Sequence, residues 1–296
     1  MTAAIRSTGQ ASQLPAGPSG LTSVLYELGF RVLNFLSGLS WFQNLTKRQR
    51  GRMALLQLFL KEMNFPEASW NDITRRSVST DLAGRLWGGR FLRLAPVTVE
   101  GLENIATARK AGRGIILVRS HQKLGRGRTS SPLSFWLANQ EFRPEYTMGR
   151  APRHSALRMN VPKQLSGAQD LWIARDLLQK GRVVEIVPDG QRGTSAISIR
   201  FFDRDRELRT GFAELAVAAR ASVIPLFLEF GLDGAIKIRV LPALHVPDGA
   251  PHEQQIASLI NQYAEILSNF WLANPHLIAG RYLKRHLASP KKPGAG

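Results

Sequence analysis

The stretch that decides the fold covers residues 181–230 and reads GRVVEIVPDGQRGTSAISIRFFDRDRELRTGFAELAVAARASVIPLFLEF. An apolar strand is expected first, and it ends in the turn Pro188-Asp189-Gly190-Gln191-Arg192. A basic loop, an Ala/Leu-rich helix and a second apolar strand through Val223-Ile224-Pro225 follow. This order is typical of an α/β protein with a mainly parallel sheet flanked by helices. Open α/β sheets place ligands at the carboxyl ends of strands, so we expect a site at residues 188–192.

Composition limits the kinds of site that the chain can hold. The 296 residues are 44% apolar, which is enough for one large core. No cysteine is present, which excludes disulfides, thiolate nucleophiles and cysteine-ligated metal. The histidines show no ligand spacing with an acidic residue, so the sequence predicts no metal site.

The chain carries 40 Lys and Arg against 22 Asp and Glu, a formal net charge of +18. A charge of this size favours an anionic partner, and nucleic acid, anionic lipid and an acidic carrier protein are the candidates. Trp41 and Phe42 follow an apolar helix and precede a basic run at residues 47–52, an order typical of a lipid interface. No nucleic-acid-binding motif is found. We therefore expect anionic membrane lipid as a partner, and no nucleic acid.

The patterning divides the chain into four parts: a tail at 1–19, a helical membrane-associating region at 20–95, an α/β domain at 96–288 and a tail at 289–296. From Leu21 to Leu39 the apolar residues recur at helical spacing, with Glu27 and Arg31 on the opposite face. These charges oppose a spanning helix, so we expect a helix that lies in the membrane interface. A tilted insertion, or packing of the apolar face on the core, is the alternative.

A buried strand is expected at Ile115–Val118, and His121 follows it closely. A side chain at this position would face the crevice at the carboxyl edge of the sheet. Such a histidine is either a catalytic base or a structural hydrogen-bonding residue.

Four stretches resemble the bacterial lipid A biosynthesis acyltransferases, within the lysophospholipid and glycerolipid acyltransferase superfamily. They are GIILVRSH ending at His121, the turn at 188–192, TGFAELAVAARASVIPLF at 210–227, and NQYAEILSNFWLANPHLIAGRYLKRHL at 261–287. With the apolar N-terminal region, the likeness covers about residues 20–287, so it extends over the whole domain.

The resemblance implies transfer of a fatty acyl group from an acyl carrier protein or acyl-CoA thioester to a hydroxyl of a polar lipid or glycolipid. It implies no cofactor, and a peripheral or monotopic position on the cytoplasmic face of a bacterial inner membrane. His121 would be the base that takes the hydroxyl proton. Arg192, with Gly190 and Gln191, would bind the phosphate or sugar head of the acceptor.

The chain departs from the family pattern at Arg126, because the family has an acidic residue five positions after its histidine. Such an acid fixes the tautomer of the ring and stabilises the imidazolium. Three accounts are open. Asp189 supplies the carboxylate from a neighbouring strand, or His121 works alone with Arg126 and Arg128 holding it neutral, or the chain binds lipid or an acyl carrier without turnover. We predict His121 and Asp189 as catalytic, and Gly190, Gln191, Arg192, Arg126 and Arg128 as substrate-binding residues.

Overall fold

The computed structural model describes residues 20–39, 47–86, 95–122, 136–137, 140–148, 167–189 and 195–289. A six-stranded sheet lies at its centre, in the order β1-β8-β7-β2-β4-β3. The strands are β1 Val97–Glu100, β2 Ile115–Arg119, β3 Tyr146–Thr147, β4 Val183–Ile186, β7 Ser222–Phe230 and β8 Ile236–Val240. Neighbouring strands pair in parallel except β7 with β8, which are antiparallel. The predicted mainly parallel sheet is confirmed.

The two strands that carry the predicted site lie side by side in the middle of the sheet. β2 pairs in parallel with β4 on one side and with β7 on the other, and Val118 lies opposite both Ile186 and Pro225. The residues from Ile115 to Val118 are all buried. Such an unbroken apolar run is typical of a parallel strand that is covered on both faces.

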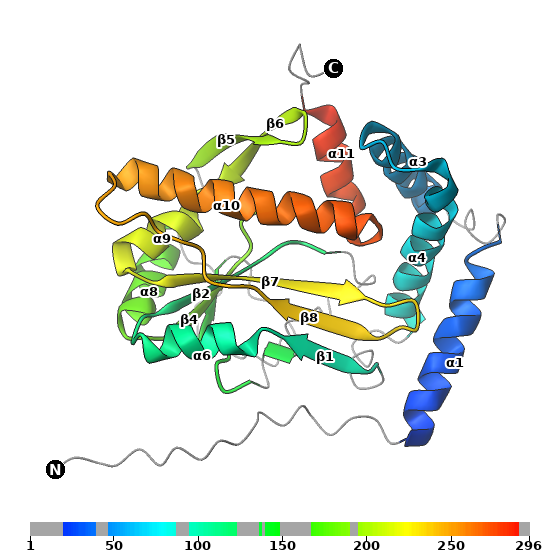
Figure 1. Cartoon of the computed structure of the whole chain (residues 1–296), viewed down its shortest axis with the longest axis horizontal. Helices are drawn as coiled ribbons and strands as arrows, with labels where there is room; N and C mark the ends of the chain where they lie inside the picture. Colours follow the sequence, from blue (N-terminus) through cyan, green and yellow to red (C-terminus); the bar gives the residue numbers. More distant parts are fainter. Residues whose placement is uncertain are drawn as a thin grey trace.

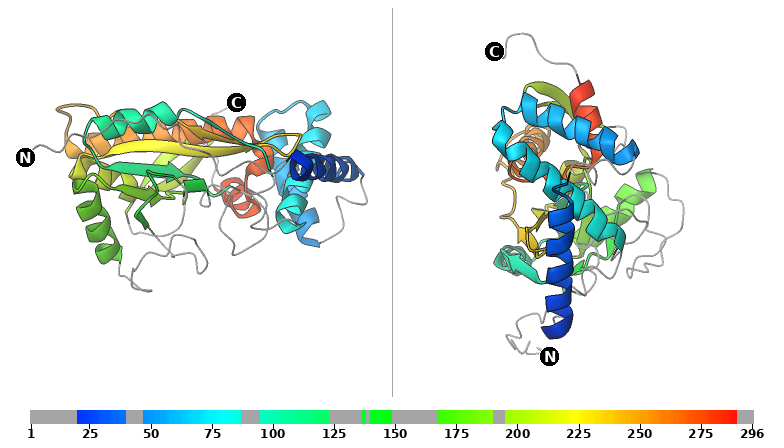
Figure 2. Two further views of the ribbon diagram at one scale, coloured as in Figure 1. Left: turned by 90° about the horizontal axis from the view of Figure 1, so that it is seen from below. Right: turned by 90° about the vertical axis from the view of Figure 1, so that its right-hand side faces the viewer.

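Helices flank the sheet and connect its strands (Figure 1). They are α6 Leu102–Lys110, α8 Gly167–Gln179, α9 Gly211–Ala219, α10 His252–Ala273 and α11 Gly280–Ala288, with the short 3-10 helix η2 Pro275–Leu277 before α11. α6 and α8 lie on opposite sides of the sheet in the left view of Figure 2. Between β4 and α9 the chain forms a separate antiparallel hairpin of β5 Ala196–Phe201 and β6 Arg204–Arg209, against which α10 packs.

Among the described residues, three helices precede the sheet and form one end of the molecule in Figure 1: α1 Gly20–Leu36, α3 Lys47–Glu62 and α4 Glu67–Leu86. Residues 87–94, at the end of the predicted helical region, lie outside the described ones. β1 and α6 then come before β2, and neither was expected. Of the predicted tails at 1–19 and 289–296, Ser289 alone is described, and it closes α11 through hydrogen bonds to Arg285. The other tail residues lie outside the described ones.

One side of α1 packs on the protein. Tyr26 and Phe30 are almost fully buried. The Tyr26 hydroxyl donates a hydrogen bond of 2.9 Å to the Gly234 carbonyl in the turn between β7 and β8, and the Phe30 ring meets Phe230 edge-on at 5.1 Å. Gly234 has φ +85°, and a Cβ there would lie 2.7 Å from the Phe30 ring, so both the turn and the docked helix require glycine.

The other side of α1 is an exposed apolar stripe. Its six residues have exposed fractions of 50–73%, and they are Leu21, Val24, Leu25, Leu28, Val32 and Phe35. Packing on the core is thus correct for the side of the helix that carries Tyr26 and Phe30. Docking of the exposed stripe on a membrane stays a prediction. No described helix is both long enough and apolar enough to cross a membrane.

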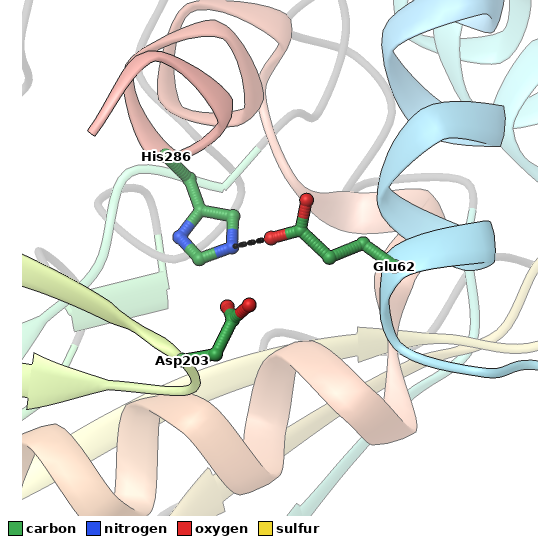
Figure 3. A group of neighbouring side chains, drawn as sticks. All are labelled: Glu62, Asp203 and His286. Atoms are coloured by element: carbon green, nitrogen blue, oxygen red, sulfur yellow. Dashed lines mark ion pairs between the residues drawn. The ribbon is translucent and has the colours of Figure 1, made fainter. Parts of the chain in front are cut away.

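A buried ion pair and a buried histidine join α3, α11 and the β5–β6 hairpin. The Arg204 guanidinium donates to both carboxylate oxygens of Glu62 at 2.6 Å. His286 is fully buried, and its Nε2 lies 3.5 Å from Glu62 Oε1 (Figure 3). Burial lowers the pKa of His286 to about 4, although the Glu62 charge opposes the shift. Burial also lowers the pKa of His276 in η2 to about 3.

These two histidines predict a loss of stability in mild acid. Both are neutral in the folded protein down to about pH 4, whereas in the unfolded chain they bind protons below about pH 6.5. The free energy of unfolding should therefore fall as the pH decreases from 6.5 to 4, and each histidine should contribute up to about 1.4 kcal/mol per pH unit. His286→Phe, in a pocket lined by aromatic rings, should remove about half of this slope in urea unfolding. His252→Gln, at an exposed position, should leave the slope unchanged. If the free energy of unfolding of His286→Phe depended on pH as steeply as that of the wild type, the role given to His286 would be contradicted.

Candidate active site

His121 and Asp189 lie together at the carboxyl edge of the sheet. Each follows its strand by two or three residues, and the parallel register that sets Val118 opposite Ile186 brings the two side chains into contact. His121 Nδ1 lies 2.5 Å from Asp189 Oδ1. The backbone N–H of His121 donates to the other oxygen, Oδ2, at 2.8 Å. The predicted pairing of a histidine with the Asp189 carboxylate is therefore present.

Burial differs sharply between the two partners. The Asp189 side chain is 2% exposed, whereas the His121 side chain is 34% exposed. A carboxylate accepts hydrogen bonds, so its contact with Nδ1 favours the tautomer that carries the proton on Nδ1. Nε2 is then the basic nitrogen of the ring. The pair thus combines a buried acid with an accessible base.

Tyr282 of α11 holds the plane of the imidazole. The rings of His121 and Tyr282 are stacked, with centroids 5.3 Å apart and planes 26° apart. Tyr282 is itself buried, and the guanidinium groups of Arg281 and Arg285 lie 4.8 and 5.9 Å from its ring. Burial, and then the Asp189 charge, raise the pKa of Tyr282, so its hydroxyl stays protonated. The stack limits rotation of the ring that carries the base.

Gln122 fixes the loop that bears His121. The ladder between β2 and β7 ends with Arg119 opposite Leu226. Beyond it, the Gln122 side-chain amide donates to the Leu228 carbonyl at 2.6 Å and accepts from the Leu228 N–H at 3.1 Å. The amide thus takes the place of a peptide group and satisfies two backbone groups of β7. The backbone of Gln122 also forms a bridge with Ile278, just before α11.

The other predicted site residues cannot be located. Arg126, Arg128, Gly190, Gln191 and Arg192 lie outside the described residues, so their roles stay predictions. Tyr282 and Gln122 were not predicted as site residues. The sequence contains a weak indication for Gln122, since it is a polar residue next to the candidate base His121. It contains no indication that Tyr282, 161 positions further along the chain, would contact His121.

One group of possible metal ligands is found in the described part of the chain. Oxygen and nitrogen atoms of Glu62, Asp203 and His286 lie within 4.8 Å of one another (Figure 3). Both Glu62 oxygens are already bound by the Arg204 guanidinium, which supplies the positive charge that a metal would bring. We therefore interpret the group as an ion-pair network and assign no metal to it.

Comparison with known proteins identifies a similar protein family. The model of the bacterial lipid A biosynthesis acyltransferase family matches residues 153–269. Over this segment the chain is similar to the lipid A acyltransferase family. The resemblance predicted from the sequence is confirmed. The segment includes Asp189, whereas His121 precedes it.

One solved structure that is similar to this chain is the 1-acyl-sn-glycerophosphate (LPA) acyltransferase PlsC from Thermotoga maritima. The two share 16% sequence identity, and the match covers 90% of this chain and 98% of that chain, with a TM-score of 0.39. No curated protein shows significant sequence similarity to the chain.

The role of Gln122 as an anchor predicts a stability effect. Gln122→Met should lower the free energy of unfolding by about 1–3 kcal/mol, because the N–H and C=O of Leu228 lose their partner. Urea unfolding with an unchanged m-value measures this directly. Gln254→Met, at an exposed position of α10, is the matched control and should change stability by less than about 0.5 kcal/mol. Equal free energies of unfolding for Gln122→Met and Gln254→Met would contradict a stabilising role of the Gln122 amide.

Proposed function

We propose that the protein is an O-acyltransferase that moves a fatty acyl group from a thioester to a hydroxyl of a polar lipid or glycolipid. The observation that carries this proposal is the 2.5 Å contact between His121 Nδ1 and the buried Asp189 carboxylate. Similarity of residues 153–269 to the lipid A acyltransferase family supports the reaction class. An acyl carrier protein or coenzyme A would carry the thioester, and no cofactor takes part.

The pair can serve as a general base. Nε2 of His121 accepts the proton of the acceptor hydroxyl while the hydroxyl oxygen attacks the thioester carbonyl carbon. A C–O bond forms and the carbonyl oxygen becomes an oxyanion. When the carbonyl re-forms, the C–S bond breaks and the departing thiolate takes the proton from Nε2. The Asp189 carboxylate stabilises the imidazolium between these two steps.

The position of Asp189 bears on the missing acid at position 126. With a carboxylate already on Nδ1, the base does not need an acid five residues further along the chain. This geometry favours the first of the three accounts. The alternative function is a homologue that binds lipid or an acyl carrier without turnover, and activity measurements separate the two.

Substrate binding is assigned from sequence. Arg192 has the planar fork that binds phosphate oxygens in pairs, and Gly190 and Gln191 precede it in the sequence. Arg126 and Arg128 follow His121 in the sequence and would attract the anionic groups of the donor or acceptor. The net charge of +18 is consistent with an anionic lipid and an acidic carrier protein as partners.

The exposed side of α1 has the properties of a membrane-binding surface. The six-residue stripe Leu21, Val24, Leu25, Leu28, Val32 and Phe35 is exposed while the opposite side of α1 is docked on the protein. Burial of such a stripe in the headgroup region, aided by the basic charge, gives interfacial binding. The proposed location is therefore peripheral or monotopic on the cytoplasmic face of a bacterial inner membrane.

Substitution of the pair tests the reaction. His121→Ala and Asp189→Asn should each lower kcat by at least about 100-fold, and the double variant should be little worse, because the two residues act as one unit. The assay measures thiol released from acyl-CoA and acyl carrier protein thioesters, with vesicles of bacterial polar lipid as acceptor. The chain has no cysteine, so a thiol reagent detects only the product.

Two controls make this result specific. His245→Ala removes an exposed histidine and should leave transfer unchanged. The mass of the acylated lipid confirms transfer rather than thioester hydrolysis. Wild-type rates in both His121→Ala and Asp189→Asn would reject the proposed function. A wild-type protein that binds acyl carrier protein and vesicles but releases no thiol would establish the binding homologue instead.

The membrane proposal predicts binding to vesicles through the stripe. Wild-type protein should sediment with vesicles that contain anionic phosphatidylglycerol, and salt should weaken this binding because it screens the charges. Replacement of Leu21, Leu25, Leu28 and Phe35 by Gln should reduce sedimentation at least about tenfold without loss of folding. Trp172→Gln, an exposed apolar residue of α8, is the control and should bind as wild type does. Unchanged sedimentation of the fourfold variant would remove α1 from the membrane contact.

A further inference from the structure

Arg52 of α3 is a buried cation that binds the backbone of distant segments. Its exposed fraction is 8%. Its Nη2 donates to the carbonyls of His276 and Ile278, at 2.8 and 3.2 Å, and its Nη1 donates to the Ser77 carbonyl of α4 at 3.3 Å. One guanidinium therefore joins α3 and α4 to residues 276–278, the segment that leads into α11.

The charge of Arg52 is retained although the side chain is buried. Burial lowers the pKa of Arg52 to about 10, and the Asp81 charge opposes the shift, so the guanidinium stays protonated at neutral pH. Burial of a charge costs free energy, and an apolar side chain would fill the same space at a lower cost. The other inward residues of α3 are apolar, among them Leu56 and Phe59. A specific reason for an arginine at this position is therefore expected.

The segment 276–278 needs donors of this kind. His276, Leu277 and Ile278 each have an exposed fraction of 3% or less, and the 3-10 helix η2 ends at Leu277. The last carbonyls of a helix have no acceptor role within the helix, and buried carbonyls must find a donor elsewhere. Arginine presents its N–H groups in a rigid planar fork, which can bind two carbonyls at once. The two bonds from Nη2 therefore fix the path of the chain between α10 and α11.

This segment contacts the base in two ways. Ile278 forms a backbone bridge with Gln122, the residue that follows His121. Four residues after Ile278, the Tyr282 ring stacks on the His121 ring, with centroids 5.3 Å apart. The Tyr282 N–H donates to the Ala279 carbonyl at 2.8 Å, so the turn that carries the ring begins next to the residue that Arg52 binds.

Two buried arginines hold opposite ends of α11. Arg52 binds the carbonyls just before its first residue, and its side chain lies along Gly280, where a Cβ would be 3.5 Å from the Arg52 Cγ. Arg204 donates to the Ser289 carbonyl just after its last residue. Tyr282 lies in the first turn of α11. The orientation of its ring therefore depends on Arg52 more directly than on Arg204.

We infer that Arg52 is a positioning residue of the proposed acyltransferase site, which fixes residues 276–278 so that Tyr282 and Gln122 hold the His121 ring in place. This inference rests on the proposed function. Arg52 acts on the base only through this segment, so it is not a catalytic residue. It makes α3 and α4 part of the support of the active site (Figure 1).

The stack between His121 and Tyr282 gives a readout that needs no substrate. In protein with ¹³C-labelled histidine, the His121 ring signals are those missing from His121→Ala, and the ring current of Tyr282 displaces them. Tyr282→Leu marks their position without the stack. Arg52→Gln should move the His121 signals most of the way from the wild-type position to that of Tyr282→Leu. Arg52→Lys keeps the charge but lacks the fork, so it should give an intermediate position.

Arg204→Met is the matched control, since it removes the buried arginine at the other end of α11. It should lower the melting temperature, because Glu62 loses its partner, but leave the His121 signals at their wild-type position. Arg52→Lys keeps a buried donor and should fold, so poor folding of Arg52→Gln does not decide the outcome. Equal displacement of the signals in Arg204→Met and Arg52→Gln would show a general loosening of α11 and would overturn the inference.

Kinetics then connect the position of the ring with the reaction. Arg52→Gln should lower kcat by about 10- to 100-fold and change KM for thioester and lipid by less than about twofold, because Arg52 orients the base and binds no substrate. Arg52→Lys should recover part of the loss. The assay is the thiol release and lipid mass measurement used for His121→Ala.

The two measurements separate failure of this inference from failure of the proposed function. Wild-type ring signals in both Arg52→Gln and Arg52→Lys would overturn the role of Arg52, even if His121→Ala abolishes transfer. Displaced signals with an unchanged kcat would overturn it as well. If the signals are displaced but His121→Ala transfers acyl groups at the wild-type rate, the proposed function is rejected and Arg52 remains only an anchor of the stack.

Discussion

The parallel pairing of β2 with β4 is the constraint on which the site depends. In this register Val118 lies opposite Ile186, and the two chains then leave the sheet at the same edge, with His121 on one and Asp189 on the other. Both strands are buried apolar runs. A shift of the register by one residue would turn every side chain of β2 to the opposite face, so the packing of the sheet fixes the geometry of the pair.

Elements far apart in the sequence hold the base once the strands have placed it. The Gln122 amide continues the β2–β7 ladder, and the Tyr282 ring of α11 stacks on the imidazole. α11 is in turn held against α3 and the β5–β6 hairpin by the Glu62–Arg204 pair and the buried His286. The N-terminal helices therefore support the active edge as well as presenting the exposed stripe of α1. This arrangement links the helix that carries the exposed stripe to the loop that bears His121 through the core.

Much of the fold and the central pair could be predicted from the sequence, because both follow from local patterns. Apolar runs predicted β2, β4 and β7, and helical spacing predicted α1. The turn expected after β4 put Asp189 at the same edge of the sheet as His121. The supports of the pair could not be predicted, since the contact between Tyr282 and His121 depends on the final direction of α11. The docked side of α1 could not be predicted either. Tyr26 and Phe30 pack on the β7–β8 turn, a contact that depends on Gly234.

The inward position of Arg206 is a feature that the sequence pattern could have predicted. The alternation of β6 that buries Leu208 also places Arg204 and Arg206 on the inner face, and period-two patterning contains this information. From the sequence, this stretch was expected only to be a basic loop. What could not be predicted is the pair of rings that holds the Arg206 guanidinium, because Phe201 and Trp271 meet only when the hairpin packs against α10.

The most direct test of the central claim is the ¹⁵N chemical shifts of the His121 ring at neutral pH, in wild type and in Asp189→Asn. If Asp189 orients the base, the wild-type protein shows a protonated Nδ1 and an unprotonated Nε2, and the Asn variant loses this preference. A wild-type ring with its proton on Nε2, or the same tautomer in both proteins, would contradict the account.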